Sequence, residues 1–212
     1  IGEQNDQGSY TPTAYLYGVA IYASAPIVVA ETAMCGNSNT VPEDGSAHGG
    51  GVYGSSTTLD LLNVLIAGNY VVSTNAGSRG GGVAFASGTL AMTNCTVVNN
   101  GPEGLWVGAS GARSVMNSIF WGNGDDLVNL PANGLGVLTN VWYCDIEDGD
   151  NLGVQGCISV DPLFADSVYY HLQSRQGNYV GGYFSGGGWN SSLEDSPCID
   201  AGDPDSDWEQ EP

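Results

Sequence analysis

Residues 90–100 read LAMTNCTVVNN, and three other stretches of the chain repeat this pattern. In each copy an alternation of apolar residues is followed by a polar residue and, six positions later, by an asparagine. The pairs are Glu31 and Asn37, Asn63 and Asn69, Asn94 and Asn100, and Asn117 and Asn123. The closing asparagines are 32, 31 and 23 residues apart. A repeat of roughly 20–50 residues is typical of a solenoid or an array.

Aligning the four copies on the closing asparagine produces columns of similar side chains. The columns are Ile27, Leu59, Leu90 and Arg113; Val29, Leu61, Met92 and Val115; and Met34, Ile66, Val97 and Phe120. The first two columns are two residues apart, which is the period of a β-strand. A further shift of 23 residues adds Leu138 to the second column and Tyr143 to the third, with Ile146 in place of the asparagine. Arg113 is the weakest position of the alignment.

These columns predict an all-β fold, a right-handed parallel β-helix of about five or more coils with long loops. Equivalent residues of neighbouring coils would then lie about 4.8 Å apart, so that like side chains stack on like. Asparagine suits the bends because it tolerates the left-handed conformation, and stacked asparagine amides can bond to one another. The runs Gly49–Val52 and Gly80–Val83 are predicted to be tight corners that lead into strands.

The composition agrees with this prediction and excludes several functions. Glycine accounts for 33 of the 212 residues, lysine is absent, and the only arginines are Arg79, Arg113 and Arg175. The net charge of −20 argues against nucleic acid and against anionic membrane surfaces, since both bind basic side chains. No run of about 18 apolar residues is present, so no segment is expected to span a bilayer.

We expect three parts along the chain. Residues 1–14 are an N-terminal segment of a truncated chain, residues 15–146 are the β-helix coils, and residues 147–212 are irregular acidic and glycine- and aromatic-rich C-terminal coils that end incomplete. The chain begins at Ile1 without methionine and stops in an acidic stretch. It therefore has the character of a processed or truncated piece, and missing targeting signals carry little weight.

The five cysteines form no zinc-binding pattern. They are Cys35, Cys95, Cys144, Cys157 and Cys198; none belongs to a CxxC pair, and His48 and His171 lie near none of them. Cys35 and Cys95 occupy different positions of the repeat and are not expected to stack. The favoured interpretation is that the cysteines are small buried apolar residues. The alternative is a disulfide between Cys144 and Cys157 across the acidic loop.

Four motifs carry a resemblance to a family. They are NSIFWGN at 117–123, VDPLF at 160–164, YHL at 170–172 and SPCIDAGDP at 196–204. Their order resembles bacterial right-handed parallel β-helix proteins of the choice-of-anchor Q type, and the GGGV and asparagine repeats resemble passengers of polymorphic outer-membrane proteins. The resemblance covers residues 15 to 208. It implies the fold and an extracellular or cell-surface location, but no activity, because this architecture hosts lyases, hydrolases, adhesins and stalks.

Loop carboxylates are the best enzymatic candidates. A glycoside hydrolase needs two carboxyl groups roughly 5 to 9.5 Å apart, and Asp125, Asp126, Asp145 and Asp148 could meet on one side of the coils. Resemblance to β-helix lyases would instead imply a basic residue near the abstracted proton, and the three arginines are scattered. The motifs of polygalacturonases are absent. A solvated acidic rim without catalysis is the favoured interpretation, so the sequence leans against an enzyme.

The acidic C-terminus is a candidate calcium site. Asp203, Asp205, Asp207 and Glu209 alternate along the chain, and carboxylates at alternate positions can surround one hard cation. Trp208 stands where an EF-hand has glycine, and an acidic frayed terminus is the favoured alternative. The sequence indicates no other cofactor.

Two tryptophans form a candidate glycan platform. If Phe120 points inward, Trp121 points outward by strand alternation, and Trp142 is expected to do the same about one coil later. Such a pair could stack on sugar rings. Partial burial under the loops is the favoured alternative.

Three functions follow from these observations. The leading hypothesis is a non-catalytic extracellular or cell-surface β-helix protein that acts as a stalk, an adhesin or a fibre subunit. Its expected partners are polysaccharides or copies of itself. The alternatives are a polysaccharide-degrading enzyme that uses the loop carboxylates and a carbohydrate-binding module that uses the tryptophans.

Overall fold

The computed structural model describes residues 15–18, 20–41, 45–73, 77–183 and 185–206. This part of the chain is all-β and contains no helix. The first repeat consists of β1 (Tyr15–Tyr17), β2 (Ile21–Ala23), β3 (Ile27–Cys35) and β4 (Ser38–Thr40). The second consists of β5 (Ser46–His48), β6 (Val52–Gly54), β7 (Thr57–Ala67) and β8 (Tyr70–Val72).

Longer strands form the next two repeats. The third contains β9 (Val83–Thr93) and β10 (Thr96–Val98), and the fourth contains β11 (Leu105–Met116) and β12 (Ile119–Trp121). Short strands follow: β13 (Leu127–Val128), β14 (Val141–Trp142) and β15 (Asp145–Ile146), and then the hairpin strands β16 (Asn178–Val180) and β17 (Gly188–Asn190).

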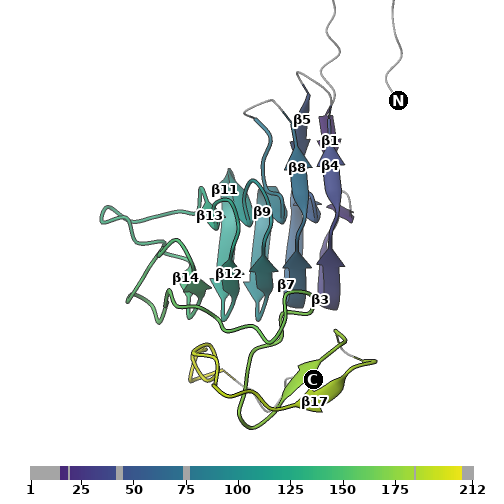
Figure 1. The fold of residues 1–212 in the computed structure, drawn as a ribbon. Helices are drawn as coiled ribbons and strands as arrows, with labels where there is room; N and C mark the ends of the chain where they lie inside the picture. The colour runs from purple at the N-terminus through teal and green to yellow at the C-terminus, as the bar shows by residue number, and fades with distance from the viewer. Residues whose placement is uncertain (1–14, 19, 42–44, 74–76, 184, 207–212) are drawn as a thin grey trace, which may run out of the picture.

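Equivalent strands of successive repeats pair in parallel. The order β3, β7, β9, β11 runs through the four repeats, and β10 lies between β7 and β12. Eleven strands belong to this one sheet. Figure 1 shows the strands side by side, from β3 of the first repeat to β14 near the far end.

The predicted columns are confirmed through four repeats. Pairing places Leu59 between Ile27 and Leu90, and Arg113 beside Leu90. The two other columns match in the same way. The predicted fifth members are wrong, because Val115 pairs with Val141 and Phe120 with Ile146. This interval is therefore 26 residues and not 23.

The first asparagine of each copy makes a left-handed bend. Asn63, Asn94 and Asn117 have φ angles of 53°, 54° and 50°, and Glu31 has 48° in the same position. Asparagine reaches this region at lower cost than most residues, which confirms the predicted reason for its use. In the fourth interval, which leads to the fifth repeat, Tyr143 takes the left-handed bend, with φ of 52°. The strand therefore resumes at Asp145, which explains the longer interval.

The closing asparagines form a directional amide ladder. Asn37 Nδ2 donates to Asn69 Oδ1 at 2.8 Å, Asn69 Nδ2 to Asn100 Oδ1 at 3.0 Å, and Asn100 Nδ2 to Asn123 Oδ1 at 3.0 Å. In the same direction, each of the three donor residues also gives its backbone N–H to the oxygen of the next asparagine.

The ladder also ties each repeat to the one before it. The amide nitrogens of Asn69, Asn100 and Asn123 donate to carbonyl oxygens of the preceding repeat. The side chains of Asn69 and Asn100 therefore link their own repeats to both neighbours, and that of Asn123 links its repeat to the preceding one. Buried polar groups of this kind stay stable only when every donor and acceptor has a partner.

Glycine is required beside the ladder. A Cβ atom at Gly51 or Gly82 would lie 2.8 or 2.4 Å from the carbonyl oxygen of the equivalent glycine in the next repeat, and 3.3 or 3.2 Å from the side chain of Asn69 or Asn100. At Gly104 it would lie 2.9 Å from the Asn123 side chain. Gly49 and Gly80 have φ of 69° and 64° and precede β6 and β9. The predicted glycine corners are therefore confirmed, and the ladder supplies a reason that the pattern alone did not.

Apolar side chains, most of them aliphatic, fill a continuous core along the repeats. Leu59, Leu90, Phe85 and Phe120 are fully buried within it. Arg113 ends the first column: its guanidinium lies 5.3 Å from the centroid of the Phe85 ring and donates to the carbonyl oxygens of Gly108 and Gly88. Arg113, the residue that fits the alignment least well, therefore covers the end of the apolar column with a charged group.

The C-terminal part of the chain runs back along the outside of the sheet (Figure 1). Phe164, Tyr170 and Tyr183 pack with Leu65, Ala67, Val98, Ala33 and Trp121 in a second apolar cluster. Tyr183 reaches the side chain of Cys35 in the first repeat. The segment therefore contacts repeats from the fourth back to the first.

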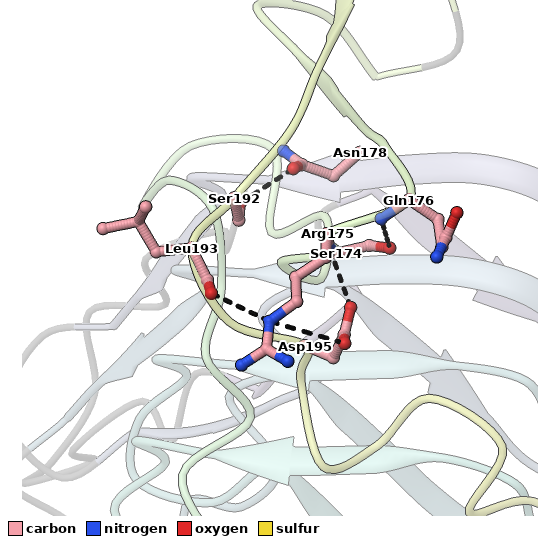
Figure 2. A network of polar contacts seen from close by, with 7 residues as sticks. All are labelled: Ser174, Arg175, Gln176, Asn178, Ser192, Leu193 and Asp195. Carbon is pink, nitrogen blue, oxygen red and sulfur yellow. Dashed lines mark hydrogen bonds and ion pairs between the residues drawn. The ribbon is translucent and has the colours of Figure 1, made fainter.

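Polar contacts close the base of the β16–β17 hairpin (Figure 2). The Arg175 backbone N–H donates to Asp195 Oδ1 at 2.7 Å, and Arg175 Nε donates to the Leu193 carbonyl at 2.9 Å. Ser192 Oγ donates to Asn178 Oδ1 at 2.8 Å. These bonds hold the two arms of the hairpin together at its base, beside the start of β16 and the end of β17.

We expect Asn100→Ala to lower the free energy of unfolding by about 3 kcal/mol, because it leaves several buried donors and acceptors without partners. Asn37→Ala is the matched control from the same ladder. It removes the half-exposed first rung and is expected to cost about 1 kcal/mol. Urea unfolding of both variants measures the difference, and equal losses would contradict the ladder as a buried, cooperative element.

Candidate functional site

Carboxylates gather in a pocket at the end of the asparagine ladder. The pocket has a volume of about 300 Å³ and is lined by Asn123, Gly124, Asp125, Asp126, Glu147 and Asp148. Two bends form it, one after β12 and one after β15. Because these strands pair in parallel through Phe120 and Ile146, the residues that follow them emerge side by side.

Asp126 is the buried member of the pocket, with 2% of its surface exposed. Its Oδ1 accepts from Asn123 Nδ2 at 2.8 Å, where another asparagine oxygen would stand if the ladder continued. Asp126 therefore caps the ladder.

The backbone N–H of each of Asp126 and Asp148 donates a hydrogen bond to the carboxyl group of the other. Asp126 N–H donates to Asp148 Oδ2 at 3.3 Å, and Asp148 N–H donates to Asp126 Oδ2 at 3.2 Å. The two carboxyl groups are thus held side by side, one buried and one exposed.

Burial and like charge raise the pKa of the pocket's acids. Burial raises the pKa of Asp126 to about 6, against the hydrogen bond from Asn123. Burial and the nearby Asp148 charge also raise the pKa of Asp125. No arginine lines the pocket. Chemically, the site offers an acid whose pKa is raised toward neutrality beside other carboxyl groups, a combination suited to proton transfer.

Asp145 lies apart from the other three predicted carboxylates. It lines a separate cavity of about 580 Å³ between the repeats and residues 198–206. Its oxygens accept from Val160 N–H and from Cys198 Sγ, both at 3.0 Å. The structure therefore brings Asp125, Asp126 and Asp148 together, and gives Asp145 a role in holding the C-terminal segment.

The two predicted platform tryptophans do not share a column. Trp121 pairs with Val98 and is half-buried in the second apolar cluster, whereas Trp142 pairs with Met116 in β14. The predicted spacing depended on Phe120 aligning with Tyr143, which is wrong. Glycan binding by either residue stays a prediction.

The most exposed described tryptophan was missed by the sequence analysis. Trp189 on β17 is 78% exposed, and its ring lies 5.8 Å from that of Tyr179 on β16. The glycine-rich run around it was a hairpin signal. Only the antiparallel pairing of the two strands shows that the rings meet.

The predicted calcium loop is described only in part. Asp205 N–H donates to Asp203 Oδ1 at 3.0 Å, and Asp203 N–H donates to Asn117 Oδ1 at 2.9 Å. Asp207 and Glu209 lie outside the described residues. Within the described ranges no group of three or more histidine, cysteine or acidic residues could hold a metal ion. Calcium binding at the terminus stays a prediction.

All five cysteines are free thiols, so the alternative of a Cys144–Cys157 bridge is not met in the structure. Cys95, Cys144 and Cys157 are buried in the core, as the favoured interpretation expected, whereas Cys35 is exposed and Cys198 is half-buried. Cys35 and Cys95 lie in different columns.

Comparison with protein-family models, curated proteins and solved structures finds no match to this chain. Among the described residues no helix is long and apolar enough to cross a membrane. Function must therefore be argued from the chain's own geometry.

The raised pKa of Asp126 predicts a pH-dependent stability. A carboxyl whose pKa is higher in the folded state stabilises the fold when protonated, so its contribution is lost as pH rises from about 4 to about 6. In Asp126→Asn the amide stays neutral and keeps the ladder cap. Between pH 4 and 7 the free energy of unfolding of this variant should fall by about 1 kcal/mol less than that of the wild type.

Asp126→Ala removes both the titrating carboxyl group and the acceptor for Asn123 Nδ2, whereas Asp126→Asn removes only the titrating group. The alanine variant should show the same reduced pH slope but lower stability at every pH, because Asn123 Nδ2 loses an acceptor. Urea unfolding at several pH values checks both variants. An unchanged slope in Asp126→Asn would contradict the assignment.

Proposed function

We propose that the chain is a right-handed parallel β-helix that serves as a structural or adhesive protein outside the cell or at its surface. The parallel register of equivalent residues through successive repeats supports the β-helix. The family resemblance and the acidic, lysine-free composition support the location. The adhesive or structural role rests on one observation, the contrast between the two ends of the stack.

Among the described residues the first repeat presents an open edge. Within that part of the chain, strands β1, β2, β3 and β4 each pair with one neighbour, in the second repeat. Ile27 occupies an inward column but is 36% exposed, whereas Leu59 beneath it is fully buried. The Oδ1 atoms of Asn69, Asn100 and Asn123 each accept a hydrogen bond from the preceding asparagine. No described residue donates to Asn37 Oδ1.

The opposite end is capped although not every strand there is paired twice, since β13 and β14 each pair with β11 alone among the described strands. Arg113 covers the first column, Asp126 caps the ladder, and residues 155–158 lie along the last strand, where Ile158 N–H donates to the Cys144 carbonyl at 2.9 Å. Unpaired strand edges recruit further strands, and capped ends do not. We therefore infer that association takes place at the first repeat.

Such an arrangement favours pairs over fibres. A chain with one adhesive edge can join a second copy edge to edge about a twofold axis, which closes the assembly. Open-ended growth needs two complementary ends. Of the roles considered, an adhesin or a paired stalk therefore fits better than a fibre subunit.

We expect concentration-dependent dimerisation in sedimentation velocity. Salt should strengthen it, because the net charge of −20 opposes the approach of two copies and is screened by ions. Val28→Glu should weaken association about tenfold or more, since Val28 lies on β3 and is 65% exposed.

Val154→Glu is the matched control. Val154 is also an exposed valine, but it lies at the capped end, and its substitution should leave association unchanged. A wild-type chain that stays monomeric at all concentrations and salt levels would refute the edge-to-edge proposal.

A second candidate function is glycoside hydrolysis in the acidic pocket. Its support is Asp126, whose pKa is raised to about 6, held beside Asp148 and near Asp125. Asp126 would donate the proton to the leaving group, and an exposed carboxylate would act as base or nucleophile. The role of Asp126 as ladder cap, and its burial, make this the weaker candidate.

Reducing-sugar release from acidic and neutral polysaccharides tests the hydrolase. If the pocket is catalytic, Asp126→Asn and Asp148→Asn should each lower the rate by about 10²–10⁴-fold, whereas Asp205→Asn in the exposed tail should not. No release by the wild type, or release unaffected by either pocket variant, would dispose of this candidate.

A further inference from the structure

One core column carries three of the five cysteines. Cys95, Ser118, Cys144 and Cys157 each follow a left-handed bend or its equivalent, and each donates to the carbonyl two residues earlier. The acceptors are Thr93, Met116, Trp142 and Gln155. The residues one position later pair in parallel in the same order: Thr96 with Ile119, Ile119 with Asp145, and Asp145 with Ile158.

This register decides which cysteines can be bridged. Cys144 and Cys157 occupy neighbouring layers, so their Cα atoms are about 4.8 Å apart, within the range of about 4.4–6.8 Å that disulfides span. Cys95 is two layers from Cys144, about 10 Å away, with Ser118 between them. Cys35 lies in another column, beside Ala67.

Cys198 is also separated from the pair. Its Sγ bonds to Asp145 Oδ2 at 3.0 Å. Since Asp145 follows Cys144 in the strand, its side chain points to the opposite face. No other described cysteine can therefore reach Cys144 or Cys157 without movement of the backbone.

We propose that Cys144 and Cys157 are a disulfide site, joined when the protein folds in an oxidising medium. Both side chains are buried in the same core, with 1% and 2% of their surfaces exposed. Their thiols already lie within hydrogen-bonding reach of each other. The bridge goes beyond the proposed function, and its formation does not depend on association at the first repeat.

The bridge would fasten the closed end of the stack. It encloses residues 145–156, including β15 and the loop that supplies Glu147 and Asp148 to the acidic pocket. In the structure this loop is held by backbone bonds such as Tyr143 N–H to the Gln155 carbonyl and Ile146 N–H to the Ile158 carbonyl. A covalent link beside them would resist opening of the last layer.

The chemistry is thiol–disulfide exchange with a small disulfide such as oxidised glutathione. Cys157 attacks first in this scheme, as the thiolate that it forms while its segment is still exposed to solvent. Its thiolate displaces one glutathione thiolate and forms a mixed disulfide. Cys144 then loses its proton to solvent and attacks Cys157 Sγ, releasing the second glutathione. Two protein thiols are oxidised as one glutathione disulfide is reduced.

Burial sets the timing of this exchange. Oxidised glutathione cannot reach side chains that are about 2% exposed, so the bridge should form while residues 147–157 are still unfolded. Oxidation during refolding should therefore be much faster than oxidation of the folded, reduced protein.

The test is refolding in a glutathione redox buffer, followed by alkylation without reduction and peptide mapping. We expect a linked pair of peptides containing Cys144 and Cys157, alkylation of the other three cysteines and, before alkylation, an intact mass about 2 Da below that of the reduced chain. Five alkylated cysteines, or a bridge between any other two, would overturn the proposal.

Thermal unfolding supplies a second measurement. Oxidation should raise the Tm of the wild type and of Cys35→Ser by about 5–10 °C, and should leave the Tm of Cys157→Ser unchanged. A similar rise in Cys157→Ser would overturn the proposal. If Cys157→Ser does not fold, the peptide map of the wild type still decides.

Discussion

The structure depends on the need of every buried amide for partners on both sides. Asn69 and Asn100 are bonded to the repeats before and after them, so neither side chain can be satisfied by its own repeat alone. This requirement sets the register between repeats, and the register aligns the aliphatic columns of the core. Glycine at 51, 82 and 104 accompanies this register, because a Cβ atom there would come too close to the backbone of the next repeat or to the ladder.

A stack held in this way has two ends with unsatisfied groups, and the chain treats them differently. At one end a carboxylate replaces the next amide oxygen, and a guanidinium covers the apolar column. At the other, the first repeat keeps a free strand edge and a half-exposed isoleucine within the described chain. The side chains of Asp126 and Arg113 therefore serve first to stabilise the fold. This is why the proposed function rests on the open end, and why the acidic pocket carries only the second candidate.

Much of the repeat could be predicted because its signal is local. Apolar alternation and a polar residue at a fixed distance mark the strands and the bends, and four copies are enough to define columns. The prediction failed at the fifth repeat, where Tyr143 makes a bend that asparagine makes in the three repeats before it. Nothing in the amino-acid sequence indicates that a tyrosine will adopt the left-handed conformation. With three residues more than expected, Val141 and Ile146 took the positions assigned to Leu138 and Tyr143.

The sequence by itself determined the all-β character, the columns of the four clear repeats and the role of glycine at the corners, since each depends on spacing along the chain. Only the tertiary structure decided which loops meet. It separated Asp145 from the acidic pocket, placed Trp121 and Trp142 in different columns, and brought Cys157 beside Cys144 while Ser118 keeps Cys95 away. The reason is that irregular connections of unequal length carry no periodicity. Where they end is set by the hydrogen bonds and packing of the layers they join, and those form only in the folded chain.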